Sequence, residues 1–575
     1  MKSLLSSLLL VSTSIFAQQP DLKTPYEKGN GNQSATYKET IEFYQKLDQA
    51  YETISMRAMG ITDSGEPLHI VTYNPAKNFD FNAIHSSNKT ILLINNGIHP
   101  GETDGIDATM LFMKDLASGK LTAPKNTVVV AIPVYNIGGA LNRNSTSRVN
   151  QNGPEAYGFR GNARNFDLNR DFVKSDTKNS RSFQNIFQMV YPDAFIDNHV
   201  SNGADYQYTL TYIATHYQKL GGYLGTFFDR QMMTSILEDV KHKAIESVPY
   251  VNIYNKTPEN GFAKNMDTPR FSTGYASMFN SLGVMVETHM LKPYSDRVRA
   301  TYEYMHSTLD YMDTKNLLIK KLRKEAWLNY KANTKYTVQW EIDSAAVREI
   351  PFLGYEGSYK SSDVSKKPRL YYDRTKPFRK LIPFYEVYKP KKEITIPRAY
   401  IVPKEQWEAI DLLKLNKIEM TALKKDTTIT VESYKITDYK TGKEPFEGHY
   451  GHYDTSVSSS ETKITFHEGD YLIYTMQRNV KYLLETLEPE ATDSFFNWNY
   501  FDAILQQKEY YSPYVFEDLA KKVLDENPKL KAELEQKRKT DKDFAENGAA
   551  QLDWVYKNSK YFEKSYLQYP IYRLK

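Results

Sequence analysis

The chain has 575 residues, of which 40% are hydrophobic and 25% charged, a composition typical of globular proteins, and its length indicates two or three domains. Its 74 basic and 70 acidic residues leave a net charge of only +4, a balance that argues against a nucleic-acid-binding protein. The chain contains no cysteine, which excludes disulfides and thiolate metal ligands.

The first residues have the pattern of a secretory signal. Lys2 gives a positive start, an apolar and small-residue stretch follows from Leu4 to Phe16, and Ala17 precedes two glutamines. We predict a signal peptide over residues 1–17, and a secreted or periplasmic protein. The absence of cysteine fits a bacterial exterior or periplasm. The apolar stretch is shorter than the roughly 20 residues that a membrane span needs, and no later stretch is long and apolar enough, so we expect no membrane span.

The next 290 or so residues alternate between strand and helix patterns. Residues 18–36 are polar and rich in Gly and Asn, and we expect them to be flexible. Apolar residues at helical spacing follow over 37–56, and a strand is predicted over 68–71. Apolar runs predict buried strands at 90–94, 127–134, 194–196 and 284–286, and helices are predicted at 104–116, 180–190 and 217–243. This alternation indicates an α/β fold over 37–325, a mixed, mostly buried β-sheet flanked by helices.

The alternation of strand and helix patterns ends at about residue 330. Half-buried strand patterns at 428–436 and 471–474 indicate a β-rich accessory domain over 335–485. Residues 514–539 are helical and strongly charged, with a break at Asn527-Pro528, so a helical C-terminal region is predicted over 486–575. We find no pattern that indicates the role of these two regions.

A candidate metal site follows the predicted strand 90–94. The loop after it ends in His99-Pro100-Gly101-Glu102, and His99 is the only one of the 11 histidines with Glu three residues on. Imidazole and carboxylate are both suitable zinc ligands, and active sites of open α/β sheets lie beyond the carboxyl ends of strands. Catalytic zinc usually has three protein ligands, and His199 at the end of the strand that begins at Ala194 is the candidate third. We therefore predict one zinc ion per chain.

A further motif relates these residues to a known family. Asp167-Leu168-Asn169-Arg170-Asp171-Phe172 resembles the D-x-N-R-N-[FW] signature of the zinc metallocarboxypeptidases, the carboxypeptidase A/B-like group. That family has H-x-x-E, this signature, a strand-end His and a catalytic Glu on a late strand, in that order. All four occur here within residues 37–320, with Asp171 where the family usually has Asn. The resemblance implies a bacterial secreted member with a C-terminal extension.

The resemblance also implies roles for individual residues. Asn169 and Arg170 would bind the terminal carboxylate of the substrate, which the planar guanidinium of arginine binds through two parallel hydrogen bonds. Asp167 would accept a hydrogen bond from the first zinc-bound histidine. Glu287, at the end of the buried strand 284–286, would be the general base. His289 is a nearby polar residue that does not match the family position.

Two family positions have several candidates here. The arginine that stabilises the oxyanion could be Arg143, Arg148, Arg160 or Arg164, and spacing favours Arg148. Tyr275 is the nearest candidate for the tyrosine that closes over the substrate, although it lies closer to Glu287 than the family pattern expects, and Arg270 is an alternative substrate-binding residue.

These residues predict a zinc metallocarboxypeptidase acting on peptides with a free C-terminal carboxylate. An amidase or deacylase on the same scaffold, for example one that trims cell-wall peptides, is an alternative. An inactive binding module is a third hypothesis, which the intact ligand set and Glu287 disfavour. A second group, His449, His452 and His467-Glu468, could form another metal site, but Gly-rich loops with scattered histidines are more often exposed turns, so this group is left out of the predicted site.

Overall fold

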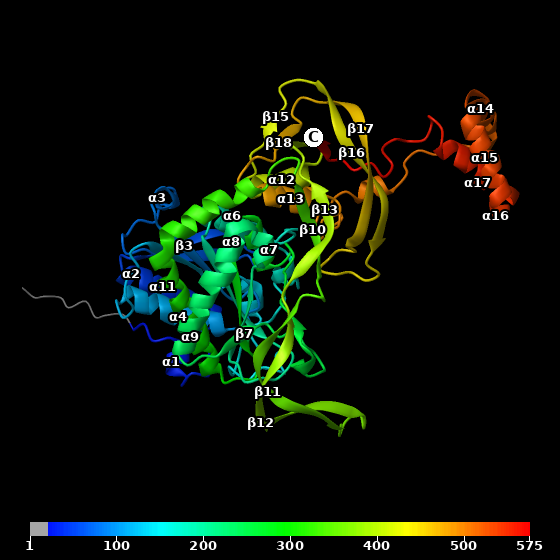
Figure 1. Cartoon of the computed structure of the whole chain (residues 1–575). Coiled ribbons are helices and arrows are strands. Elements are labelled where there is room, and N and C mark those ends of the chain that lie inside the picture. Colours follow the sequence, from blue (N-terminus) through cyan, green and yellow to red (C-terminus); the bar gives the residue numbers. More distant parts are fainter. Residues whose placement is uncertain (1–20) are drawn as a thin grey trace, which may run out of the picture.

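A central mixed sheet organises the first half of the molecule. The computed structural model describes residues 21–575, so the predicted signal peptide over residues 1–17 lies outside the described part of the chain. The sheet has eight strands in the order β1-β2-β4-β3-β5-β9-β6-β7 (Figure 1). Its strands are β1 (Ile54–Ile61), β2 (Pro67–Tyr73), β3 (Thr90–Asn95), β4 (Thr127–Ile132), β5 (Ala194–Ser201), β6 (Leu210–Ala214), β7 (Ser247–Pro249) and β9 (Leu282–His289). The neighbours β4, β3, β5 and β9 are parallel and buried along their whole length, as their continuous apolar runs predict.

Helices cover both faces of this sheet. One core cluster joins the sheet to α2 (Tyr37–Ala50), α4 (Asp104–Ala117), α9 (Met233–His242) and the long α11 (Tyr294–Ala326). The other joins it to α3 (Phe81–Ser86), α6 (Lys178–Val190) and α10 (Ser272–Met278). Alternate residues of β3 point into the two clusters, Leu92 and Ile94 into the first and Ile91 and Leu93 into the second. The predicted α/β fold is confirmed.

Two predicted helices differ from those observed. The helical spacing over 37–56 extends too far, because α2 ends at Ala50 and Ile54 to Met56 begin β1, paired with β2. The segment 217–243 is divided into α7 (Tyr217–Leu220), α8 (Gly222–Phe227), a π-helical turn (Phe228–Met232) and α9. Gly221 and Gly222 both have positive φ, which ends α7 and turns the chain.

The residues that precede α2 hold more structure than their polar composition indicates. They form α1 (Pro25–Lys28), where Thr24 and Glu27 make a reciprocal capping box. The backbone N–H of Ala35 then donates to Oδ1 of Asp107 on α4 at 3.2 Å. This segment therefore packs against the sheet domain.

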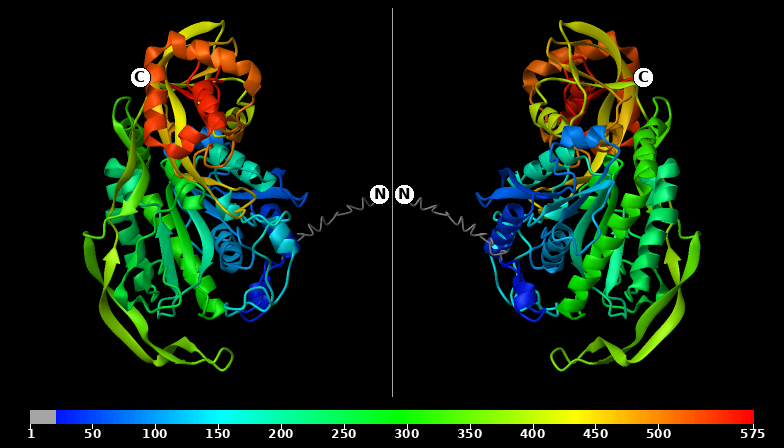
Figure 2. Two further views of the ribbon diagram at one scale, coloured as in Figure 1. Left: turned by 90° about the vertical axis from the view of Figure 1, so that its right-hand side faces the viewer. Right: turned by 90° about the vertical axis from the view of Figure 1, so that its left-hand side faces the viewer.

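The second half of the chain is built from hairpins and a further sheet. Strands β10 (Lys335–Ile342) and β13 (Tyr388–Thr395) pair with each other, and β11 (Val347–Ser361) and β12 (Pro368–Tyr385) form a long hairpin that β8 (Phe262–Ala263) joins. A six-stranded sheet has the order β15-β18-β14-β19-β16-β17. Its strands are β14 (Ala399–Val402), β15 (Thr421–Ala422), β16 (Thr427–Thr441), β17 (His452–Phe466), β18 (Tyr471–Tyr474) and β19 (Tyr572–Leu574). The region 486–575 thus adds a strand to the accessory sheet as well as helices. Figure 2 shows the yellow, orange and red part of the chain gathered above the sheet domain.

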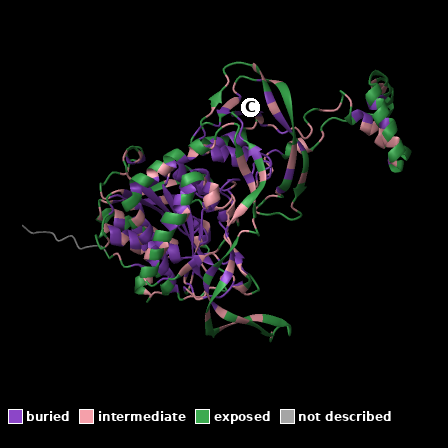
Figure 3. Ribbon diagram, in the orientation of Figure 1, coloured by how far each residue is buried: buried purple, intermediate pink, exposed green. Residues whose placement is uncertain are grey.

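Residues 335–575, here called the accessory part, share a hydrophobic core with the sheet domain, residues 37–325. Helices α12 (Trp407–Leu415) and α13 (Val480–Leu487) belong to the same core cluster as α6 and α10. By contrast, α14 (Pro513–Glu526), α15 (Pro528–Thr540), α16 (Lys542–Glu546) and α17 (Gly548–Lys557) have a small core of their own and are set apart in Figure 1. Figure 3 shows that their surfaces are largely exposed. The predicted break at Asn527-Pro528 is confirmed, since it separates α14 from α15.

Along residues 21–575, no helix combines the length and the apolar character that crossing a membrane would require.

Candidate active site

The candidate metal ligands come from two neighbouring strands of the central sheet. His99 and Glu102 lie in the turn that connects β3 to α4, and His199 lies on β5. Glu287 on β9 is the register partner of His199. Because β3, β5 and β9 are parallel, their carboxyl ends meet at one edge of the sheet, where an open α/β sheet places its site. The short α5 (Ile137–Leu141), after β4, borders the same edge.

The three ligand side chains converge on one point. One ligand atom from each of His99, Glu102 and His199 lies within 4.8 Å of the other two, and all three residues are buried. Nδ1 of His99 is 3.2 Å from Oε1 of Glu102, and Nδ1 of His199 is 3.0 Å from Oε2. The His99 Nδ1 atom is buried and has no hydrogen-bond partner among residues 21–575. An unpaired ring nitrogen beside a carboxylate and a second imidazole fits a bound metal ion.

The outer nitrogen of each histidine is held by a different carboxylate. Nε2 of His99 lies 2.9 Å from Oδ1 of Asp167, and Nε2 of His199 lies 2.9 Å from Oδ2 of Asp197. These bonds orient both rings with Nδ1 towards the metal position. Asp197 was not predicted from the sequence, although the D-x-H spacing on a strand places both side chains on one face of the sheet.

Two arginines neutralise the carboxylates of the site. Nη1 of Arg148 is 2.7 Å from Oε1 of Glu102, and Nη1 of Arg160 is 3.8 Å from the same oxygen. Arg160 also donates to Oδ2 of Asp167 from Nε at 3.1 Å and from Nη2 at 2.8 Å. Burial alone would raise the pKa of Asp167, but its hydrogen bond with His99 and the charge of Arg160 hold the pKa below its ordinary value. Spacing favoured Arg148, whereas the structure places both Arg148 and Arg160 beside the metal ligands.

Glu287 is a buried acid at the same edge of the central sheet, on β9. It is 7% exposed, and its backbone carbonyl accepts a hydrogen bond from Oγ1 of Thr211 at 2.8 Å. Burial raises the pKa of Glu287 to about 8, and the nearby charge of Glu102 acts in the same direction.

A cavity of about 280 Å³ connects these groups to the substrate-binding candidates. Asn169 and Arg170 follow Asp167 in a 3₁₀ turn, where Nη1 of Arg170 donates to the carbonyl of Asn169 at 2.7 Å and its guanidinium lies 4.5 Å from the centre of the Phe271 ring. The cavity is lined by His99, Glu102, Arg148, Arg160, Asn169, Arg170, His199, Val200, Asn202, Ile213, Tyr250, Tyr254, Asn265, Asp267, Phe271, Met285 and Glu287.

The prediction for Tyr275 is wrong. Tyr275 is 0% exposed, and its ring packs in the core with that of Phe187. Its hydroxyl donates to Oδ1 of Asn416 in the accessory part at 2.6 Å. The tyrosines that line the cavity are Tyr250 and Tyr254, whose hydroxyls lie 2.9 Å apart.

The other polar candidates have structural partners elsewhere. Arg270 is bound by Asp493, and His289 stacks on Tyr206 with Nε2 3.3 Å from Asp205. The histidines of the accessory loop lie against separate carboxylates, His449 against Asp176 and His452 against Asp502.

The accessory part contacts the substrate-binding turn directly. Oε2 of Glu447 accepts a hydrogen bond from the backbone N–H of Asp167 at 2.8 Å. Asp493 accepts from the backbone N–H of Arg270 at 2.9 Å and from its Nε at 2.6 Å. Two residues on from Arg270, the N–H of Ser272 donates to Oδ1 of Asn169 at 3.1 Å. The accessory part therefore supports the turn from two sides.

Comparison with known proteins identifies the domain that contains this site. Residues 40–219 match the family described as zinc carboxypeptidase. The chain carries a zinc carboxypeptidase domain. The match includes His99, Glu102 and His199, and the enzyme class is zinc metallopeptidase. No curated protein matches the chain significantly.

Several solved structures resemble part of this chain. A metallo-carboxypeptidase from Burkholderia cenocepacia is 15% identical, with a TM-score of 0.36, and the match covers 49% of this chain and 70% of that one. Carboxypeptidase A from Helicoverpa armigera is 13% identical, with a TM-score of 0.37 and coverage of 49% and 74%. A metallo-carboxypeptidase from Pseudomonas aeruginosa is 13% identical, with a TM-score of 0.36 and coverage of 48% and 69%.

Proposed function

We propose that the protein is a metallocarboxypeptidase that removes the C-terminal residue from peptides. The observation that supports this most directly is that Arg170 and Glu287 line the same cavity as the three metal-ligand candidates. Arg170 offers a fixed positive charge to a terminal carboxylate, and Asn169 lies beside it. The group that binds the chain end thus faces the group that would act on the adjacent peptide bond.

The metal would be held by His99, Glu102 and His199. A zinc ion held by these residues would make a water molecule more acidic and would polarise the scissile carbonyl. The residues of the chain supply the remaining functions. Glu287 accepts the proton that the attacking water loses and transfers it to the leaving amine, so that hydroxyl and proton are added across the broken C–N bond. Arg148 and Arg160 place positive charge where the oxyanion develops.

Substrates with a free and a blocked terminal carboxylate test the proposed specificity. We expect the purified protein with zinc to cleave a peptide with a free C-terminus, and amidation of that peptide to lower kcat/KM roughly 10- to 100-fold, since a charge-assisted contact is lost. Arg170→Gln should lower kcat/KM for the free peptide by a similar factor and leave the residual rate on the amide unchanged. Equal rates on both peptides would instead favour an amidase or deacylase.

A variant of the acid tests the proposed mechanism. Glu287→Gln should lower kcat roughly 100- to 10,000-fold, because the proton acceptor is lost, while the zinc content measured by elemental analysis stays that of the wild type. The control is Glu238→Gln, an exposed acid on α9. Full activity of the Glu287→Gln protein would exclude this residue as the base. A wild-type protein that holds zinc but cleaves neither peptide would indicate a binding module.

A further inference from the structure

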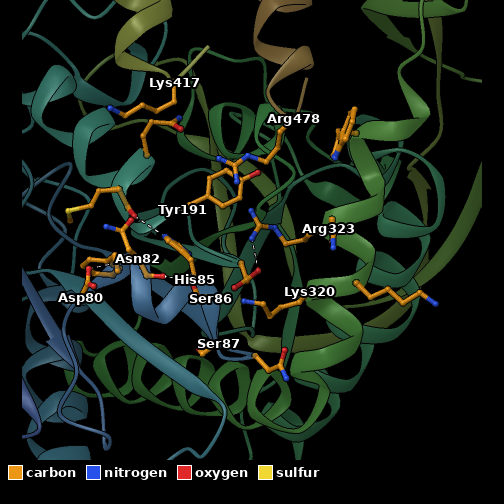
Figure 4. A pocket seen from close by; sticks show the side chains of 18 of the residues that line it. Asp80, Asn82, His85, Ser86, Ser87, Tyr191, Lys320, Arg323, Lys417 and Arg478 are labelled. Carbon is orange, nitrogen blue, oxygen red and sulfur yellow. Dashed lines mark hydrogen bonds and ion pairs between the residues drawn. The ribbon is translucent and has the colours of Figure 1, made fainter. Parts of the chain in front are cut away.

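A second, larger cleft lies where the sheet domain meets the accessory part. This seam cleft has a volume of about 1470 Å³ (Figure 4). One wall comes from α3 and from the residues that precede β5, a second from the C-terminal half of α11, and a third from the accessory loops at 417–419 and 476–478. Concave sites between domains are common places for ligands, and this volume exceeds the 300–1,000 Å³ or so of a typical small-molecule pocket.

The seam cleft is rich in positive charge that the protein itself does not neutralise. Seven of its lining residues are Lys or Arg, and one of them, Arg323, is paired with Asp193 at 2.5 Å. The other six have no ion-pair partner within residues 21–575. They are Arg57, Lys320, Lys321, Lys324, Lys417 and Arg478. With the three acids that also line the cleft, the seven cations leave a formal net charge of +4 in the lining.

The acids of the cleft offset this charge only in part. Besides Asp193, the lining includes only Asp80 and Glu419. Oδ1 of Asp80 accepts from the backbone N–H of Asn82 and caps α3, and Glu419 is exposed on the accessory side. An unbalanced group of cations in a concave site attracts anions more strongly than the same charges on a flat surface.

Several of the cationic side chains are fixed in place before any ligand binds. The guanidinium of Arg478 lies 4.0 Å from the centre of the Tyr191 ring, and that of Arg323 lies 4.8 Å from the same centre. Nζ of Lys320 donates to the carbonyl of Lys89 at 2.9 Å. Figure 4 shows Lys417 and Arg478 in the upper part of the view and Lys320, Ser86 and Ser87 below them. A preorganised site loses less side-chain entropy on binding.

This cleft is separate from the candidate active site. Met189, Tyr191 and Asp193, which line it, precede the amino end of β5, whereas His199 lies towards the carboxyl end of the strand. Ala194 and His199 are five residues apart along β5, a rise of about 16 Å at the spacing of a parallel strand. The two cavities share no lining residue.

We propose that the seam cleft binds a linear polyanion that carries several phosphate groups. Phosphate is favoured over carboxylate because each group carries up to two negative charges and its oxygens can accept from several ammonium and guanidinium groups at once. The cleft combines three α11 lysines with Lys417 and Arg478 of the accessory part. The spread of cations over both parts of the chain requires a ligand with several charges. A ligand bound in the seam cleft therefore contacts both the accessory part and the sheet domain. We expect this binding to leave peptide hydrolysis unchanged.

Calorimetric titration of the full-length protein with tripolyphosphate tests this proposal. At low ionic strength we expect saturable binding that weakens as salt is added. Lys417→Gln combined with Arg478→Gln should weaken binding roughly tenfold or more, since two charge-assisted contacts are lost. The charge-preserving pair Lys417→Arg with Arg478→Lys should retain most of the affinity. Lys522→Gln with Lys539→Gln, which removes two exposed cations of α14 and α15, should leave it unchanged.

Each other result contradicts the proposal. No binding of tripolyphosphate by the wild type, or an equal loss in the Lys522 and Lys539 variant, would show that the cleft is not the site. Equally tight binding of a hexaglutamate peptide would show that charge alone is recognised and would overturn the assignment to phosphate. Peptide hydrolysis should be the same in all four proteins, and a loss confined to the Lys417 and Arg478 variant would contradict the independence of the two sites.

Discussion

At the residue scale, each of the two histidines among the candidate ligands depends on a neighbour that fixes its ring. The two histidines use equivalent arrangements, with Nδ1 turned towards Glu102 and Nε2 bonded to an aspartate. Asp167 belongs to the motif that the sequence already shows, whereas Asp197 belongs to the strand itself and is further held by Nδ2 of Asn95 at 3.0 Å. The strand therefore supplies both a ligand and the group that orients it.

Replacing that aspartate should weaken metal binding. Asp197→Asn removes the negative charge that holds Nε2 of His199, and we expect zinc affinity, measured by competition with a chelator, to fall roughly 10- to 100-fold. The control is Asp115→Asn. Asp115 is a buried acid near the C-terminal end of α4, and it pairs with Lys120 at 2.8 Å. Unchanged affinity in the Asp197 variant would mean that Glu102 and the sheet orient the ring without it.

At the scale of elements, the accessory part acts on the substrate-binding turn through Asp493. This side chain is fully buried, and it binds both the backbone and the side chain of Arg270. The segment from Arg270 to Ser272 in turn contacts Asn169. A buried charge pair of this kind fixes position more than it adds net stability.

Loosening this contact should affect substrate binding first. Asp493→Asn weakens the pairing with Arg270, and we expect KM for a peptide with a free C-terminus to rise roughly tenfold, the effect of losing about 1.4 kcal/mol of positioning, with kcat and zinc content nearly unchanged. Asp502→Asn, which alters a contact with His452 inside the accessory part, is the control. An equal change in kcat and KM in both variants would point to a general loss of structure.

The sequence predicts most of the metal site because its signals are local. A buried strand followed by a polar loop locates His99, Glu102 and His199, and the D-x-N-R motif locates Asp167 and Arg170, which the structure brings to one edge of the sheet. Tyr275 could not be placed in this way, because its partners in the core are distant in sequence: its ring packs on that of Phe187, and its hydroxyl bonds to Asn416, which is 141 residues away. Contacts between distant segments also explain why the sequence does not predict the core shared by the two parts, or the pairing of β19 with β14 and β16.

At the scale of the whole molecule, the interface between the two parts contains a buried lysine. Lys481 on α13 is 2% exposed, and its Nζ donates to the carbonyl of Lys219 on α7 at 3.1 Å. Burial lowers the pKa of Lys481 to about 7, and the charge of Lys219 adds to this effect while Glu485 opposes it. The interface thus favours the neutral amine.

This shift makes the stability of the protein depend on pH. Between about pH 7 and the unfolded-state pKa near 10.5, the unfolded chain binds more protons at Lys481 than the folded chain, so the free energy of unfolding rises with pH over this window. Lys481→Met should raise stability at pH 6 and flatten this rise, as measured by urea unfolding at several pH values. Lys425→Met, at an exposed loop position, should change neither. A rise with pH that persists in Lys481→Met would assign the effect to another group.

The position of β19 has a consequence for how the protein is made. This strand pairs with β14 on one side and β16 on the other, and Arg573 faces Glu432 across 141 residues of sequence. The ribosome therefore completes the sheet domain and most of the accessory hairpins long before the strand that joins them. Until β19 is synthesised, β14 and β16 each present an unpaired edge, the kind of surface that other chains can bind. The nascent chain must pass through that interval, so these two edges need protection until β19 pairs with both of them.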